Sequence, residues 1–422
     1  MSENLICAID IGSFKIATVV GIISKEHDEV RVIGFDSVPS HGVKKGLIVD
    51  IDLVTHAVEQ CVEKAERMAG QKINSAFVSI GGPHITSLNS HGVVAVANAQ
   101  GEISQDDIDR VIEAARAISL SGTRHIIEVS PREYVVDGQP GIKNPIGMSG
   151  VRLEVDTHII TASQTNLKNI DRCLADLGIA NDGFIFSGLA SADSVVTDTE
   201  RELGVVLVDI GGGKTDICLY SEGSLSYSSS IGIGARHITN DIAVGLRVSL
   251  DSAEKIKLYL SKHFARRDEK IKKEAQLNLN DLLLPENVSE VSFRTLMDGI
   301  IGPRLEEVFK LIFEEIEKSG YATQIPSGVV VTGGGALTVG LIDMGKKVIG
   351  LPMRLGRPTG VTGLIDELIN PQYATTVGLI LNGRSNIMRG ERSGKDFNQL
   401  LKNFSIGQQV NKVKDLLKQF IP

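Results

Sequence analysis

The sequence predicts an α/β protein of two lobes, each with a mixed sheet at its core, and a small α+β module inserted into the first lobe. Three observations lead to this prediction. Residues 5–23 (LICAIDIGSFKIATVVGII) run from an apolar strand through an aspartate and a glycine turn into a second strand. Residues 204–223 (GVVLVDIGGGKTDICLYSEG) repeat the pattern, with Asp209 about 200 positions after Asp10, which indicates a duplicated unit. Between the two copies, residues 84–162 contain further alternating strands, which predict the inserted module.

Length and composition describe a globular chain and exclude several functional classes. The 422 residues suffice for two or three domains, and the net charge of −8 argues against a general nucleic-acid binder. Four scattered cysteines form no CxxC pair, and with no signal peptide at the N-terminus we expect the reducing cytoplasm. No apolar run approaches the ~18 residues that span a bilayer, so any membrane contact is expected to be peripheral.

The first half of the chain alternates between helix and strand patterns. Residues 50–69 predict a helix with one apolar face, stopped by a glycine. Residues 73–82 predict a strand that leads into a glycine turn. Ser104 and Asp107 resemble a capping box, which would open a helix through Ala117.

The second half continues with helices and one further buried strand. Helices are predicted from residue 234 to 243 after a glycine turn, at 251–264, around 305–316 and at 373–381. Residues 327–340 (SGVVVTGGGALTVG) predict a buried strand, a third glycine-rich turn and a following helix. The polar stretch 266–290 is expected to be exposed.

These elements divide the chain into six predicted parts. They are a first core (1–83, 163–200 and 362–381), the insert (84–162), a second core (201–247 and 313–361), a helical and mixed subdomain (248–312), a flexible linker (382–404) and an amphipathic membrane helix (405–422).

The three glycine-rich turns suggest a phosphate ligand. A turn without Cβ atoms can bring its backbone N–H groups close to a ligand, and a run of such groups binds an anion. Two facing hairpins could hold phosphates from both sides, with Asp10 and Asp209 holding Mg²⁺ through water. The third turn could let a nucleoside lie against the backbone. For either hairpin alone, a simple tight turn within a large sheet remains an equal alternative, but the three turns together favour the ligand.

The three turns also carry a family resemblance. DIGSFK (10–15), DIGGGKTD (209–216) and VVVTGGGA (329–336) resemble the first phosphate loop, second phosphate loop and adenosine motif of the actin, sugar kinase and heat-shock chaperone ATPase superfamily. GLASADSVV (188–196) and YATTVGLIL (373–381) resemble its connecting helices. Within it, the chain is most similar to FtsA, the actin-like bacterial cell-division family, from about residue 5 to the end. The insert and the basic tail fit that family, and the resemblance implies an actin-like two-lobed ATPase fold.

The resemblance implies ATP and Mg²⁺ as cofactors and assigns roles to individual residues. Backbone from both hairpins would contact phosphate, either lysine could neutralise phosphate charge, and Glu254 and Lys257 on the adenosine helix would contact ribose or adenine. An ordinary surface ion pair is the alternative for Glu254 and Lys257. The predicted cofactor residues are Gly12, Ser13, Phe14, Lys15, Gly211, Gly212, Gly213, Lys214, Gly234, Glu254, Lys257, Gly333, Gly334 and Gly335.

One departure from the superfamily concerns hydrolysis. Chaperone relatives carry an acid just before the first connecting helix, and actin uses a nearby glutamine to order the attacking water. Ser187 stands at this position here, and a serine is no strong base without help. We therefore predict no catalytic residue, and ATP binding with weak or no hydrolysis.

The basic C-terminal tail predicts a membrane anchor. Residues 382–422 carry eight basic and three acidic residues, a net charge of +5, so the preceding 381 residues carry −13. Apolar side chains at helical spacing alternate with lysines in the last residues, which is typical of a helix that binds a membrane surface. Docking back onto the body is the alternative. The predicted membrane-binding residues are Val410, Val413, Lys414, Leu416, Leu417, Lys418, Phe420 and Ile421.

Together these observations and the resemblance predict a filament-forming division protein. It would polymerise head to tail on the cytoplasmic face of the bacterial inner membrane, bind anionic lipids, anchor FtsZ at the division septum and recruit later division proteins. The alternatives are an actin-like assembly protein of a pilus system, or a sugar-kinase or chaperone-type ATPase. A kinase would need a substrate-side acid in the cleft, and a chaperone would need a substrate domain, for which about 40 residues are too few.

Overall fold

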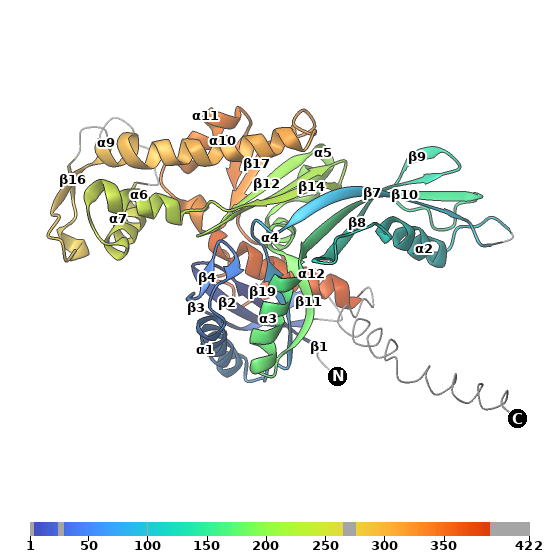
Figure 1. Cartoon of the computed structure of the whole chain (residues 1–422), viewed down its shortest axis with the longest axis horizontal. Coiled ribbons are helices and arrows are strands. Elements are labelled where there is room, and N and C mark those ends of the chain that lie inside the picture. The colour runs from blue at the N-terminus through green and yellow to red at the C-terminus, as the bar shows by residue number, and fades with distance from the viewer. Residues whose placement is uncertain (1–3, 24–28, 99, 265–275, 389–422) are drawn as a thin grey trace, which may run out of the picture.

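The computed structural model describes residues 4–23, 29–98, 100–264 and 276–388 (Figure 1). The predicted membrane helix at 405–422 and the linker residues from 389 onward lie outside the described residues. Within the described part of the chain, no helix combines the length and the hydropathy needed to cross a membrane.

The first lobe is built on a six-stranded sheet with the order β11-β6-β1-β2-β3-β19. The two strands of the first hairpin, β1 and β2, pair antiparallel, whereas β1 and β6 pair parallel, so the sheet is mixed as predicted. The strands are β1 (Asn4–Ile11), β2 (Lys15–Ile23), β3 (Val30–Pro39), β6 (Ser75–Ile80), β11 (Ala180–Phe186) and β19 (Val361–Gly363).

The second lobe repeats this arrangement in a five-stranded sheet with the order β14-β13-β12-β17-β18. Its hairpin strands β12 and β13 pair antiparallel, and β12 pairs parallel with β17, as their counterparts do in the first lobe. The predicted duplication is therefore confirmed at the level of sheet topology. The strands are β12 (Val205–Ile210), β13 (Thr215–Ser221), β14 (Ser224–Ile231), β17 (Val329–Thr332) and β18 (Met353–Leu355).

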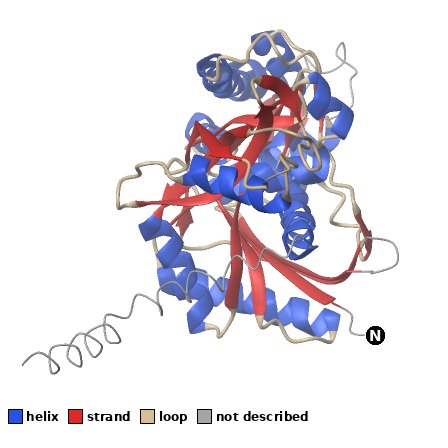
Figure 2. Ribbon diagram, turned by 90° about the vertical axis from the view of Figure 1, so that its right-hand side faces the viewer, coloured by secondary structure: helices blue, strands red, loops and turns tan. Residues whose placement is uncertain are grey.

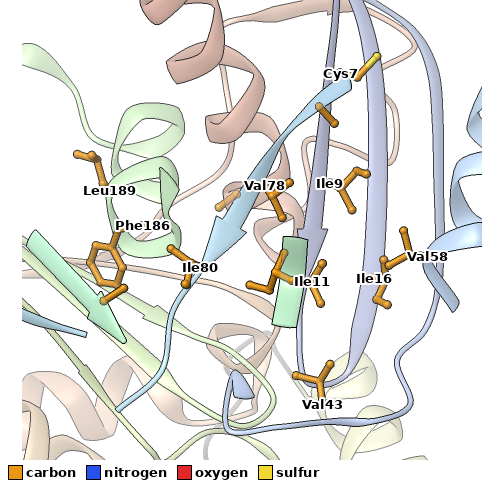
Figure 3. Packing of buried hydrophobic residues seen from close by; sticks show 14 of the residues in the cluster. Cys7, Ile9, Ile11, Ile16, Val43, Val58, Val78, Ile80, Phe186 and Leu189 are labelled. Carbon is orange, nitrogen blue, oxygen red and sulfur yellow. The ribbon is translucent and has the colours of Figure 1, made fainter. Parts of the chain in front are cut away.

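Helices cover the outer faces of both sheets (Figure 2). In the first lobe, α1 begins at Asp50, whose side chain accepts from the amide of Leu53, and ends at Gly70 in the left-handed region with φ 64°. The apolar face of α1 packs with Ile9 and Ile16 of the sheet (Figure 3). The first-lobe helices and short strands are α1 (Ile51–Ala69), α3 (Gln164–Asp176), α4 (Ser187–Val195), α12 (Ala374–Met388), the 3₁₀ turn η4 (Pro371–Tyr373), β4 (Val43–Lys44) and β5 (Leu47–Ile48). Helix α5 (Asp198–Leu203) packs against β13 of the second lobe.

The insert is a four-stranded sheet with one helix on a face, and it extends to one side of the molecule (Figure 1). The capping box is present: Ser104 and Asp107 exchange side-chain and backbone hydrogen bonds at the start of α2. The predicted α+β character of this module is thus confirmed. Its elements are β7 (Thr86–Ala95), α2 (Gln105–Arg116), β8 (Arg124–Val136), β9 (Gln139–Ile142) and β10 (Arg152–Ser163).

The helices of the second lobe surround its sheet and form the subdomain beyond it. A π-helical turn, η2, joins α9 to α10. The remaining elements are α6 (Arg236–Leu246), α7 (Leu250–His263), β15 (Gln276–Asn278), η1 (Asn280–Leu282), β16 (Glu290–Ser292), α9 (Phe293–Leu296), η2 (Met297–Ile301), α10 (Gly302–Lys318), η3 (Gly334–Leu337) and α11 (Leu341–Ile349).

Three details differ from the sequence predictions. Helix α12 continues to Met388, so the linker predicted from residue 382 begins as helix. The boundary predicted at 312/313 falls inside α10, which is one continuous helix. Within the stretch expected to be exposed, Leu277, Leu279 and Leu284 are buried in the second-lobe core. These leucines are surrounded in sequence by polar residues, so the average composition of the stretch predicts exposure and does not indicate their burial.

Candidate functional site

A deep cleft of about 1160 Å³, including the space open to solvent, lies between the two lobes. Both hairpins, the third glycine turn and helix α7 line it. Apart from Gly234, every residue predicted to contact the nucleotide or the metal faces this cleft. They are Asp10, Gly12, Ser13, Phe14, Lys15, Asp209, Gly211, Gly212, Gly213, Lys214, Glu254, Lys257, Gly333, Gly334 and Gly335. Their convergence is an observation, and their roles toward a nucleotide stay predictions.

The first hairpin (residues 12–15) presents a buried lysine to the cleft. The turn closes with the amide of Gly12 donating to the carbonyl of Lys15 at 3.1 Å. The Lys15 ammonium donates to the carbonyl of Gln372 and lies 3.5 Å from the centre of the Tyr373 ring. Burial lowers the pKa of Lys15 to about 8, with Asp10 and Asp209 opposing that shift. Lys15 therefore remains mostly protonated near neutral pH, and among the residues that the structure describes no carboxylate forms an ion pair with it.

The second hairpin (residues 211–214) holds its lysine differently. Lys214 forms a buried ion pair with Asp216 and donates to the hydroxyl of Ser187 at 2.6 Å. Ser187, in turn, lies 2.7 Å from the same Asp216 carboxylate. Lys214 thus reaches from the second lobe to Ser187 of the first lobe while it lines the cleft.

The two predicted metal-binding aspartates also differ. Asp10 accepts from Ser79 at 2.8 Å, within its own lobe. Asp209 is only 6% exposed and accepts from Ser191 at 2.5 Å and from Thr375 at 3.0 Å, both on first-lobe helices. Burial, aided by the charge of Asp216, raises the pKa of Asp209 to about 6.

This oxygen-rich pair fits the predicted Mg²⁺. Carboxylates and waters are the ligands that Mg²⁺ prefers, and a nearby cation would stabilise the buried charge of Asp209. Within the described residues, no group of three or more His, Cys, Asp or Glu side chains is arranged to hold a metal. Asp10 and Asp209 would therefore hold the ion through water, together with the phosphates of the nucleotide.

The glycines of the second hairpin are required by the first hairpin. A Cβ on Gly212 would lie 2.8 Å from the Cβ of Phe14, and one on Gly213 would lie 2.9 Å from the Cβ and the hydroxyl of Ser13. The two hairpins therefore meet tip to tip. Close approach, in addition to any ligand, explains why side chains are absent here.

Gly234 supports the second hairpin from behind instead of lining the cleft. A Cβ there would lie 2.6 Å from the carbonyl oxygen of Gly211. The next two amides, of Ala235 and Arg236, each donate at 2.9 Å to the carbonyls of Gly211 and Gly212. Gly234 thus positions the loop, whereas its neighbours Ala235 and Arg236 reach the cleft.

The third glycine turn lies against the second aspartate. Gly333 adopts φ 87°, and a Cβ on it would lie 2.2 Å from the Asp209 carboxylate. A Cβ on Gly335 would lie 2.5 Å from the side chain of Ile210. The predicted helix after this turn begins only at Leu341, because the 3₁₀ turn η3 intervenes.

Glu254 and Lys257 form more than a surface ion pair. The Lys257 ammonium lies 2.7 Å from the Glu254 carboxylate and 2.8 Å from the hydroxyl of Thr239, which itself donates to Glu254 at 2.6 Å. Lys257 is 7% exposed, and burial lowers its pKa. Within this triad of Glu254, Lys257 and Thr239, the two charged residues line the cleft, and their contact with a ribose or base stays a prediction.

Several residues of the site were missed from sequence. Asp216 is the clearest, because it closes the motif DIGGGKTD and yet was given no role. The hydroxyl donors to the aspartates sit in ordinary strand and helix contexts and offer no local signal. The missed lining residues include Ser79, Gly81, Asp216, Arg236, Leu258, Ser261, Thr338, Gln372 and Thr375.

Comparison with known proteins decides the family. Residues 82–161 match the family model described as "SHS2 domain inserted in FTSA", and residues 206–378 match "Cell division protein FtsA". The chain is 37% identical to Cell division protein FtsA of Pseudomonas aeruginosa over 386 residues, 90% of each chain. The chain belongs to the FtsA family of cell division proteins. A second FtsA, from Borreliella burgdorferi, is 37% identical over 99% of this chain and 98% of its own.

Solved structures confirm the actin-like fold. A chain of the PilM–PilN type IV pilus biogenesis complex superposes with a TM-score of 0.63, covering 90% of this chain and 98% of its own, at 14% identity. MreB5 of Spiroplasma citri bound to ADP superposes with a TM-score of 0.54, covering 91% and 98%, also at 14% identity. At such identity the likeness establishes the fold of this FtsA-family chain and nothing finer.

Proposed function

We propose that this FtsA-family protein binds Mg²⁺–ATP between its lobes and polymerises on the cytoplasmic face of the inner membrane. There it anchors FtsZ at the division septum and recruits later division proteins. The observation that carries the proposal is the convergence of two phosphate-type hairpins, a third glycine turn and two aspartates on one cleft. MreB5 with the same fold has been solved with ADP and with AMPPNP, which supports a nucleotide in this cleft.

Different residues of the cleft would bind the phosphates, the Mg²⁺ ion and the nucleoside. Backbone N–H groups of both hairpins would hold the phosphates, and Lys15 would supply positive charge, since its pKa of about 8 keeps it mostly protonated. Asp10 and Asp209 would hold Mg²⁺, which neutralises phosphate charge when bound. The triad around Glu254 and Lys257 would contact the ribose or base.

Hydrolysis is proposed to be slow. Ser187 occupies the position of the superfamily's acid, and its hydroxyl already lies within hydrogen-bonding distance of Asp216 and Lys214. A serine in this network cannot act as a strong base toward water. The nucleotide would then serve mainly to fix the relative angle of the lobes and so to control assembly.

The basic tail would supply the membrane contact. One amphipathic helix with a few lysines binds lipid only marginally, at roughly 1 kcal/mol per basic residue near an anionic surface. Many such tails on one polymer would bind well through their effective concentration. Head-to-tail contacts of identical subunits generate an open filament, which explains why anchoring and polymerisation would occur together.

Vesicle co-sedimentation with ATP, followed by electron microscopy, tests this function. The full chain should sediment with anionic vesicles and form filaments on them, and deletion of residues 406–422 should abolish sedimentation and leave ATP binding intact. Vesicles of neutral lipid provide the matched control for the charge contribution. Equal sedimentation of the truncated chain would reject the anchor.

A further inference from the structure

The insert is connected to one lobe and packs on the other. It leaves the first lobe after β6 and returns to it before α3, yet its strands β7, β8 and β10 lie against β14 of the second lobe (Figure 1). Any change in the angle between the lobes must therefore either carry the insert along with β14 or break this contact. Which of these happens depends on how β14 is bonded.

Strand β14 presents a face of serines to the insert. Ser228 is 1% exposed, and its hydroxyl lies 2.8 Å from Nε2 of His158 on β10. Nδ1 of His158 lies 2.8 Å from the Asn89 side-chain oxygen, and burial lowers the pKa of His158 to about 3, so the ring is neutral. Nδ1–H then donates to Asn89, and Nε2 accepts from Ser228. Ser87 on β7 adds a bond of 2.6 Å to the Ser228 carbonyl.

The same face of β14 leads into the cleft. Side chains two positions apart in a strand point to the same side, so Ser230 follows Ser228 along this face. The Ser230 hydroxyl donates to the Asp216 carboxylate at 2.5 Å and accepts from the amide of Gly82 at 3.0 Å. Gly82 lies at the first connection between the first lobe and the insert. Ser230 therefore joins the cleft carboxylate to the root of the insert.

At the cleft end of β14, the contacts of Asp216 are expected to change when a nucleotide binds. Asp216 forms an ion pair with the Lys214 ammonium, and a phosphate bound at the second hairpin would compete for the same cation. Loss of that cation leaves Asp216 dependent on its hydroxyl donors, of which Ser230 is one. Buried hydrogen bonds such as those of Ser228 are costly to break, so the insert should move with β14.

We infer that the insert senses the nucleotide state of the cleft through the buried serines of β14, with Ser230 as the positioning residue and the Ser228–His158 contact as the coupling to the insert. This inference rests on the proposed binding of ATP in the cleft. It assigns the insert a position that depends on the nucleotide, and hence a way for ATP to change the surface that the insert offers to other proteins.

Distance measurement between two spin labels tests the inference in the full-length chain. All four native cysteines are buried, so exposed cysteines introduced by Gln139→Cys on β9 and Glu317→Cys on α10 can be labelled selectively. Mg²⁺–ATP should leave this distance nearly unchanged, because both labels move with β14. A second pair, Gln139→Cys with Lys64→Cys on α1 of the first lobe, should shift on addition of Mg²⁺–ATP.

Ser228→Ala is the uncoupling variant, and Ser226→Ala is its matched control. Both serines are 1% exposed on β14, but in the described part of the chain the Ser226 hydroxyl bonds to the Ser224 carbonyl of its own strand and to no group of the insert. Ser228→Ala should bind ATP as the parent chain does, reduce the shift between insert and first lobe, and broaden the distribution of distances between insert and second lobe. Ser226→Ala should behave like the parent chain. Ser230→Ala should also lose the shift in label distance on addition of Mg²⁺–ATP. In this variant the Gly82 amide should exchange its hydrogen about five-fold faster, because it has lost one hydrogen bond.

Two results would overturn the inference in distinguishable ways. If the parent chain binds ATP and neither label pair responds, or if Ser228→Ala responds fully, the coupling is wrong while the proposed function stands. If the parent chain fails to bind ATP in a direct titration, the proposed function fails and the inference fails with it.

Discussion

The two hairpins of the cleft share a sequence pattern but have their polar groups satisfied in different ways. Asp10 and Lys15 of the first lobe are bonded by Ser79 and by the Gln372 carbonyl, both from their own lobe. In the second lobe, Asp209 takes its hydrogen bonds from Ser191 and Thr375 of the first lobe. The first hairpin is thus complete by itself, whereas the second is completed by the opposite lobe.

This difference teaches which hairpin responds when the lobes move. A rotation of the lobes leaves the bonds of the first hairpin intact and strains those of the second, where Lys214 also reaches Ser187 of the first lobe. Duplication of a unit therefore gives two loops with similar backbones and different surroundings. The second loop takes hydrogen bonds from the opposite lobe, so its bonds are the ones expected to change with the angle between the lobes.

Replacing each hairpin lysine should give the largest contrast in stability. Lys214→Met leaves Asp216, which is 1% exposed, without its cation and should lower the free energy of unfolding by about 4 kcal/mol. Lys15→Met removes a buried cation without a bonded carboxylate and should cost less than about 1 kcal/mol. Urea unfolding without nucleotide measures both, and equal losses would contradict the proposed division between the hairpins.

The buried aspartate should make stability depend on pH. Its pKa is raised to about 6 in the folded chain, so the unfolded state releases this proton at lower pH and stability falls as pH rises from about 4 to 6. Asp209→Asn should therefore be more stable than the parent chain by up to about 3 kcal/mol at pH 7.5 and equal to it near pH 4. Thermal unfolding at both pH values, without Mg²⁺ or nucleotide, checks the crossover. Asp10→Asn is the comparison, and the same gain there would show that the effect is not specific to Asp209.

The same residue should have the opposite effect on ligand binding. Asp209→Ala removes a carboxylate proposed to hold Mg²⁺ and should weaken Mg²⁺–ATP binding about 100-fold, with a matching loss of polymerisation. Calorimetric titration with and without Mg²⁺ separates the metal contribution from that of the phosphates. Unchanged affinity would remove Asp209 from the site.

The duplicated fold and the convergence of three turns were predictable because they follow from local patterns. Alternating strands, a glycine turn and an aspartate recur at Asp10 and Asp209, and sheet topology preserves that order. The Lys214–Asp216 pair was not predictable, since it depends on Ser187 and Gly81 approaching from the other lobe. The sequence around Lys214 and Asp216 contains no pattern that predicts contact with Gly81 or Ser187, and the same is true of the sequence around those two residues.

The serine face of β14 was missed for a similar reason. SLSYSSS reads as a polar edge strand, and its burial arises only because an insert that leaves the chain before residue 86 returns to cover it. Sequence periodicity specifies which side chains share a face of a strand, but not which distant element packs on that face. Packing between elements that are distant in sequence therefore explains why the Lys214–Ser187 contact and the buried serines of β14 could not be predicted.

The smallest expected effect on stability tests the close contact between the two hairpins, at Gly213 and Ser13. Gly213→Ala places a methyl group 2.9 Å from the Ser13 side chain, with the Lys45 amide also close at 3.1 Å, and should lower stability by about 2 kcal/mol. Ser13→Gly in the same chain should recover part of this loss, because the side chain that meets the new methyl is gone.

Gly211→Ala is the control, because its nearest contact is the Lys214 carbonyl of its own hairpin at 3.2 Å. It should show no coupling to Ser13. A double-mutant cycle by urea unfolding should give a coupling above about 0.5 kcal/mol for Gly213 and Ser13. Strict additivity would mean that the glycines of the second hairpin are kept for the ligand alone.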